Sequence, residues 1–107
     1  MTGEYIAMVL YDLPVKTKRQ KRSYHAFRKQ LKWIGFYQLQ KSVYIKKLYN
    51  YDAKKSLGVS IHRILPKEGD VRLIILTVKQ FDTTFHLLGE KKFCEKILSN
   101  KDHIISL

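Results

Sequence analysis

A run of positive charge near the N-terminus is the clearest chemical feature of this sequence. The segment 16–32 holds eight Lys or Arg residues and no Asp or Glu. Like charges one helical turn apart repel each other, and a bound polyanion would relieve that cost and release counterions. Most charge runs are solvated surface, but the absence of interspersed acids favours nucleic acid here, and a mixture of Lys and Arg is typical of contacts to phosphates. The candidate contact residues are Lys16, Lys18, Arg19, Lys21, Arg22 and Arg28.

Asp12 is the second candidate, because it is the only acid between Glu4 and Asp52 and directly precedes the basic run. Asp often satisfies amide groups at the start of a loop, so a structural cap is one interpretation. The other interpretation is a metal ligand. One carboxylate holds Mg²⁺ weakly, but a two-fold dimer would bring two copies of Asp12 to one ion, which would activate water or stabilise a leaving phosphate oxygen. Composition and spacing by themselves favour the cap.

Composition excludes several classes of protein. The chain has 107 residues, which indicates one domain, and 21 Lys+Arg against 9 Asp+Glu give a formal charge of +12. No apolar run approaches the length of a membrane span, and the N-terminus lacks a signal-peptide pattern. Cys94 is the only cysteine, so a disulfide within the chain and a cysteine-based zinc site are excluded, and the four His show no ligand spacing. We expect a cytoplasmic protein with no membrane partner.

The elements that must position these residues follow from hydrophobic periodicity. On a helical wheel the apolar side chains Tyr24, Phe27, Leu31 and Ile34 share one arc, and the cations lie opposite. A second helix begins at Asn50 or Asp52, and Lys79–Asp82 is expected to be a turn. Strands are expected over 5–11, 36–48 (as two strands joined at Lys41–Ser42), 71–78 and 83–88, and helices over 17–34 and about 53–64.

This order predicts an α+β, ferredoxin-like βαββαβ fold with an antiparallel sheet and an extra C-terminal strand. Residues 1–89 would form the nucleic-acid-binding domain. Residues 90–107 would form a C-terminal tail that contacts a second subunit or a partner.

Four short motifs, in order, resemble the Cas2 family of CRISPR-associated proteins that act in spacer acquisition, and its type II form above all. They are MVLYDLP followed by Lys18 and Arg19, then LQKSVYI, GDVRL and LLG, and together they span about residues 5–89. One departure is Lys41, which stands where the family usually has an aromatic residue before the serine.

The resemblance implies a homodimer that bridges dimers of the CRISPR integrase and holds double-stranded prespacer DNA. Several family members are Mg²⁺-dependent endonucleases for RNA or double-stranded DNA. In those members the aspartate that ends the first strand is the catalytic metal ligand, which maps onto Asp12, with one Mg²⁺ shared across the dimer axis, and the signature serine maps onto Ser42 in a supporting role. Whether this chain hydrolyses its nucleic acid stays open at this point, and the alternative function is a stand-alone, toxin-like, metal-dependent endoribonuclease.

Overall fold

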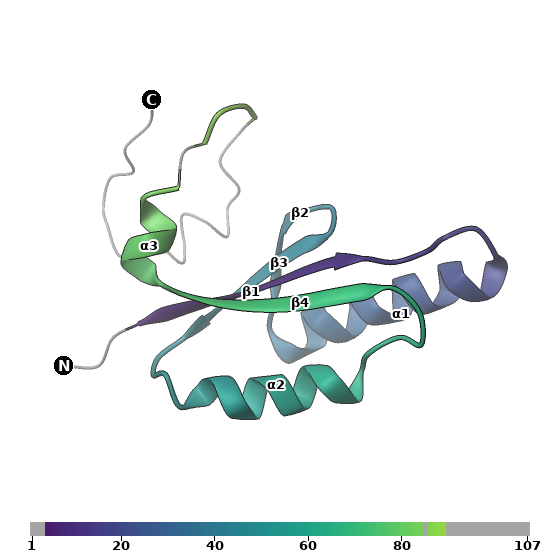
Figure 1. Cartoon of the computed structure of the whole chain (residues 1–107), viewed down its shortest axis with the longest axis horizontal. Coiled ribbons are helices and arrows are strands. Elements are labelled where there is room, and N and C mark those ends of the chain that lie inside the picture. The colour runs from purple at the N-terminus through teal and green to yellow at the C-terminus, as the bar shows by residue number, and fades with distance from the viewer. Residues whose placement is uncertain (1–3, 85, 90–107) are drawn as a thin grey trace.

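The structure, a computed structural model, describes residues 4–84 and 86–89 and consists of one four-stranded sheet, two long helices and one short helix (Figure 1). The elements in chain order are β1 (Tyr5–Asp12), α1 (Lys18–Ile34), β2 (Tyr37–Gln40), β3 (Val43–Leu48), α2 (Ala53–Arg63), β4 (Asp70–Thr77) and α3 (Val78–Asp82).

The sheet has the strand order β2-β3-β1-β4, and every neighbouring pair is antiparallel. This is the βαββαβ arrangement expected for a ferredoxin-like domain, so the predicted α+β class and antiparallel sheet are confirmed. Strand β1 lies in the middle of the sheet, between β3 and β4. Its last residue, Asp12, is paired with the first residue of β4, Asp70.

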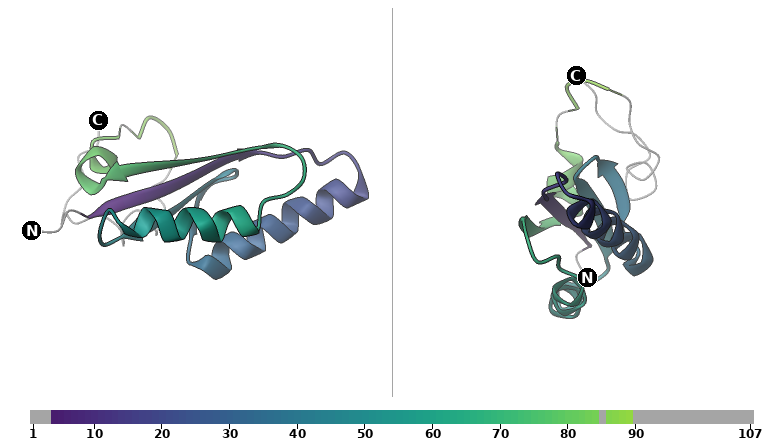
Figure 2. Two further views of the ribbon diagram at one scale, coloured as in Figure 1. Left: turned by 60° about the horizontal axis from the view of Figure 1, so that its bottom comes forward. Right: turned by 90° about the vertical axis from the view of Figure 1, so that its right-hand side faces the viewer.

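Both long helices cover the same face of the sheet, as the tilted view shows (Figure 2). The odd-numbered residues of β1 point toward these helices, because side chains alternate along a strand. They join a core that includes Val9 and Tyr11 from β1, Phe27 and Leu31 from α1, and Leu57 from α2. The other face of the sheet carries the even-numbered residues of β1, including Asp12.

Local sequence signals set the ends of both long helices. Thr17 and Gln20 form a capping box at the start of α1, and Gly35 ends the helix in the left-handed region at φ 117°. At α2 the N-cap position is Asp52, but the side chain that satisfies a helix amide is that of Asn50, whose Oδ1 accepts a hydrogen bond from the Ala53 N–H at 2.9 Å.

The segment after β4 differs from the prediction. Residues 78–82 form helix α3 where a turn was expected, and no strand is present among the described residues of 83–88. A second capping box, made by Thr77 and Gln80, starts this helix. Val78 and Phe81 then pack on Ile6 and Ile45, so α3 covers part of the face that the long helices leave open. The expected C-terminal tail, residues 90–107, lies outside the described residues.

Candidate nucleic-acid interface and metal site

Asp12 is exposed at the end of the central strand β1, on the face opposite the long helices. Its pairing with Asp70 places the two carboxylates on the same face, since directly opposite residues of an antiparallel pair share a face with Cβ atoms about 4.5–5.5 Å apart. Arg72 Nη2 contacts Asp70 Oδ2 at 3.3 Å, and both side chains are well exposed, so this ion pair contributes little to stability. Asp70 was not among the residues predicted from the sequence.

The Asp12 carboxylate accepts no hydrogen bond from any residue that the structure describes. A capping role requires such a bond to a loop amide. The described residues therefore provide no capping contact for Asp12, and its role as a metal ligand stays a prediction.

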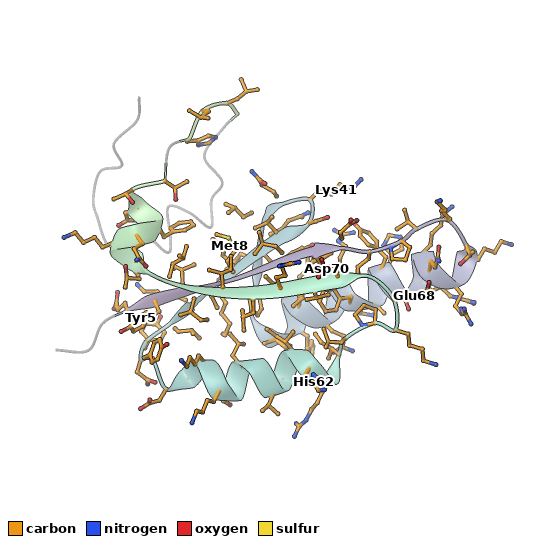
Figure 3. All side chains as sticks on the ribbon, viewed as in Figure 1. Tyr5, Met8, Lys41, His62, Glu68 and Asp70 are labelled. Atoms are coloured by element: carbon orange, nitrogen blue, oxygen red, sulfur yellow. The ribbon has the colours of Figure 1, made fainter. Side chains whose placement is uncertain are left out.

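The β2–β3 hairpin brings Lys41 and Ser42 to the same end of the sheet. The Tyr11 N–H donates to the Ser42 carbonyl at 3.0 Å, so Ser42 is tied to the residue that precedes Asp12. Lys41 is exposed, and Figure 3 shows it and Asp70 near the end of the sheet where β1 leads into α1. The structure thus places Asp12 and Asp70 on one face at this end of the sheet, with the backbone of Ser42 and the exposed Lys41 at the adjoining hairpin.

Gly69 fixes the backbone beneath Asp12. It has φ +110°, and a Cβ atom at this position would lie 2.8 Å from the Asp12 carbonyl oxygen and 2.5 Å from Leu13 Cδ2. The backbone oxygen cannot move away without shifting the end of β1. Glycine is required here both by its conformation and by close packing.

Tyr11 anchors the other face of the same strand end. Its ring stacks on Tyr44 at 6.0 Å and meets Phe27 edge-on at 5.2 Å. Burial, followed by the neighbouring Tyr44, raises the pKa of Tyr11 well above its ordinary value. The hydroxyl donates to the Lys41 carbonyl at 3.5 Å, so Tyr11 also links the end of β1 to the hairpin.

The cations of the predicted basic run form an exposed layer on α1 and on the loop before it, which we call the basic surface. Five of the six predicted contact residues, together with two further lysines of α1, are exposed and have no ion-pair partner among the described residues. The first turn of α1 contains no acid. The basic surface consists of Lys16, Lys18, Arg19, Lys21, Arg22, Lys29 and Lys32.

Arg28, the sixth predicted contact residue, has a different environment. It is half-buried, its Nε donates to the Tyr44 hydroxyl at 3.0 Å, and its guanidinium lies 5.9 Å from the centre of the Tyr24 ring. The hydrogen bond to Tyr44 raises the pKa of Arg28. Arg28 therefore connects α1 to β3, in addition to any contact with phosphate.

The sequence did not indicate that an aromatic ring would extend the basic surface. Trp33 is 88% exposed on the last turn of α1, next to Lys32. An exposed tryptophan among cations is typical of surfaces on which bases stack.

No group of three or more His, Cys, Asp or Glu side chains that could hold a metal ion occurs in the part of the chain that the structure describes. Within the described ranges, one subunit offers the two carboxylates of Asp12 and Asp70 at this end of the sheet. That donor set fits Mg²⁺, which commonly keeps several waters and takes one or two carboxylates. None of the described helices has the length and apolar character that crossing a membrane would need.

Comparison with known proteins agrees with this architecture. The family model described as "CRISPR associated protein Cas2" matches residues 5–84. A protein of Campylobacter jejuni named CRISPR-associated endoribonuclease Cas2 is 37% identical over 90 residues, which cover 84% of this chain and 63% of that protein. This chain therefore matches slightly less than two thirds of the Campylobacter relative's length.

Two further relatives carry the same name and are matched over most of their length. The Ligilactobacillus salivarius protein is 38% identical over 78% of this chain and 83% of its own. The Treponema denticola protein is 39% identical over 79% of this chain and 84% of its own. A solved structure described as "Crystal structure of cas2" superposes with a TM-score of 0.51 at 22% identity, covering 84% of this chain and 92% of that one, which supports the fold. This chain belongs to the Cas2 family of CRISPR-associated proteins.

Proposed function

We propose that this Cas2 protein binds double-stranded prespacer DNA along its basic surface and, as a homodimer, bridges dimers of the CRISPR integrase during spacer acquisition. The observation that carries the proposal is the exposed, unneutralised charge of α1. Side chains such as Lys18 and Arg22 have no described acid to pair with, so phosphates are their natural partners. Their position on one helix suits a duplex backbone that runs along it.

A homodimer is supported by the face of the sheet that the long helices leave open. Near its Asp12 end this face carries Leu10 and Val43, both partly buried, and Ile74, which is 42% exposed. Among the described elements only α3 covers this face, and it packs at the opposite end, on Ile6. Burial of these apolar side chains against a second copy would bring the Asp12 residues of the two subunits toward the dimer axis. Both basic surfaces would stay exposed on the outside of the dimer.

Metal-dependent phosphodiester hydrolysis is the second function that we propose. Its support is the pair of carboxylates at the end of β1, Asp12 and Asp70, which is independent of the basic surface. Asp12 and Asp70 would hold Mg²⁺, shared across the dimer axis with the partner's carboxylates. When bound, the ion would supply Lewis-acid stabilisation of charge on a phosphate and lower the pKa of a coordinated water. Ser42 would hold a substrate oxygen in place, and Lys41 would add positive charge beside the phosphate. The relatives are named endoribonucleases, which makes RNA the first substrate to test.

The test combines three measurements on the wild type and on Asp12→Asn. These are binding to a 30-bp DNA duplex, Mg²⁺-dependent cleavage of single-stranded RNA and duplex DNA, and spacer acquisition in cells that carry the integrase. We expect Asp12→Asn to lose cleavage and keep DNA binding, since the basic surface is untouched. Retained acquisition in that variant would identify holding DNA as the main role, whereas lost acquisition would make hydrolysis central.

Two results would contradict the proposal. A wild-type protein that sediments as a monomer at micromolar concentration would remove the shared metal site and the bridge. Duplex binding that does not weaken as salt is raised would exclude the basic surface as the contact.

A further inference from the structure

A pocket of about 510 Å³ opens beside the basic surface, between the β1–α1 loop, the first turns of α1 and the α2–β4 loop. That volume falls within the range of sites for small organic groups, about 300–1,000 Å³. Its apolar lining comes from Leu13, Pro14, Tyr24, Leu65 and Pro66. Leu65 is 39% exposed, so part of this lining is open to solvent. A flat, apolar group would bury surface here that water now covers.

Two cations lie among the lining residues. Arg19 belongs to the basic surface, and Lys67 follows Pro66 in the loop that forms the opposite wall. Both side chains are exposed and have no ion-pair partner among the described residues. The pocket is therefore continuous with the surface proposed to bind the nucleic-acid backbone, and a phosphate between Arg19 and Lys67 would hold an attached base at the apolar lining.

A carboxylate in the same pocket restricts what can enter. Glu68, labelled in Figure 3, accepts a hydrogen bond at 3.2 Å from Gln20 Nε2. Gln20 Oε1 accepts the backbone N–H groups of Lys16 and Thr17, at 2.9 and 3.1 Å, so the orientation of the amide is fixed. Glu68 has no ion-pair partner among the described residues. Its second oxygen repels a phosphate and accepts from an N–H donor.

We propose that this pocket takes one unpaired base of a bound nucleic acid, with its phosphate on Arg19 and Lys67 and its amino group on Glu68. The base stacks on the apolar lining. Cytosine binds better than thymine, because its amino group offers Glu68 two N–H donors, whereas the single N3–H of thymine lies between two carbonyls that the carboxylate repels. The inference rests on the proposed function, since the backbone must already follow the basic surface. It adds recognition of a single-stranded or splayed nucleotide to a surface otherwise suited to a duplex.

The test uses three DNA decamers with the same charge, in EDTA so that no cleavage occurs. One consists of abasic sites throughout, and the others carry a single central cytosine or a single central thymine. We expect the wild type to bind the cytosine decamer on the order of tenfold more tightly than the fully abasic one, with thymine in between. Fluorescence anisotropy measures each affinity.

Three variants assign the effect to the pocket. Ser23→Leu projects an apolar side chain from α1 into the pocket and should remove the advantage of cytosine while leaving abasic binding unchanged. Ser56→Leu makes the same change at an exposed site of α2 outside the pocket and should keep the advantage. Glu68→Gln, which offers a donor as well as an acceptor, should abolish the preference for cytosine over thymine. Thermal melts check that each variant is folded.

The outcomes separate this inference from the proposed function. If the wild type binds all three decamers equally well, the pocket proposal is wrong and the basic surface stands. If the advantage of cytosine persists in Ser23→Leu, the base binds elsewhere, for example on Trp33, and the pocket proposal is again wrong. If the wild type binds no decamer and no duplex, both proposals fail.

Discussion

Replacing Lys18, Arg19 and Arg22 together with alanine should weaken DNA binding and at the same time stabilise the fold. All three side chains are exposed, and none makes a hydrogen bond or an ion pair with a described residue. They lie in the first turns of α1, where cations are unfavourable because the helix dipole is positive at this end. Alanine also has the highest helix propensity. Nothing in the fold depends on these charges.

The expected magnitudes follow from their positions. The three cations take part in like-charge pairs one turn apart, namely Lys18 with Lys21, Lys18 with Arg22 and Arg19 with Arg22. At about 0.2–0.5 kcal/mol per pair, their loss should stabilise the fold by roughly 1 kcal/mol, which raises Tm by about 4–8 °C in a domain of this size. Three lost phosphate contacts should flatten the slope of log K against log salt by about 2.7 units, which corresponds to roughly 100-fold weaker binding at 0.15 M salt.

The assay measures duplex affinity at several salt concentrations together with thermal unfolding. A variant with Lys55, Arg63 and Lys79 replaced by alanine is the matched control, because these cations are also exposed and lie outside the basic surface. Both triple variants carry the same net charge, so an equal loss of affinity would mean that overall charge, and not α1, attracts the DNA. If the α1 variant unfolds at a lower temperature than the wild type, the claim that repulsion between these cations destabilises the fold is wrong.

Three further changes test residues around the site. Arg28→Ala removes the hydrogen bond to Tyr44 and should lower the free energy of unfolding by about 1–2 kcal/mol in urea denaturation. Gly69→Ala forces a Cβ against backbone in the left-handed region and should lower that free energy by more than about 1 kcal/mol in the same assay. Tyr11→Phe should reduce the loss of stability above pH 10, measured by unfolding at pH 8 to 11. The raised pKa of Tyr11 means that its stabilising effect is present below the ordinary tyrosine pKa and is lost as pH rises above it.

Matched controls exist for each of these changes. Lys29→Ala removes an exposed cation of α1 and should alter stability by less than about 0.5 kcal/mol. At Gly58 a Cβ meets nothing within 4 Å, so Gly58→Ala should stabilise α2 by up to about 1 kcal/mol. Tyr49 is 67% exposed, so Tyr49→Phe is the matched tyrosine replacement and should alter stability by less than about 0.5 kcal/mol. Equal effects at the paired positions would contradict the contacts assigned to Arg28, Gly69 and Tyr11.

The elements with a long, regular period were predictable from the sequence. Helix α1 was predictable because Tyr24, Phe27 and Leu31 form an apolar arc on one side and the cations occupy the opposite side. The apolar arc and the cationic side both lie within a single helix, so no tertiary information is needed to recognise them. Helix α3 was missed because five residues are too few to show a helical period. Its start was nevertheless visible in the sequence as Thr77 followed three residues later by Gln80, the pattern of a capping box.

The parts of the site that depend on register were not predictable. Asp70 meets Asp12 because β4 pairs with β1 in one particular alignment, and a shift of one residue would turn its side chain to the helix face. Arg28 falls on the cationic side of a helical wheel, but the wheel does not show that β3 brings Tyr44 within hydrogen-bond distance. Tertiary neighbours, and not local pattern, distinguish a phosphate contact from a packing residue.

The two proposed functions, DNA binding and cleavage, would use opposite faces at the same end of the domain. The basic surface lies on α1, in the helix layer, whereas Asp12 and Asp70 lie on the sheet face that the long helices leave open. A duplex that follows α1 would not pass over Asp12 unless a strand turned around the end of the sheet, where the pocket beside Arg19 opens. In the proposed arrangement, holding a duplex would therefore need none of the groups proposed for hydrolysis. Hydrolysis would need a strand that is free to bend, so we expect single-stranded RNA or a splayed DNA end to be the better substrate.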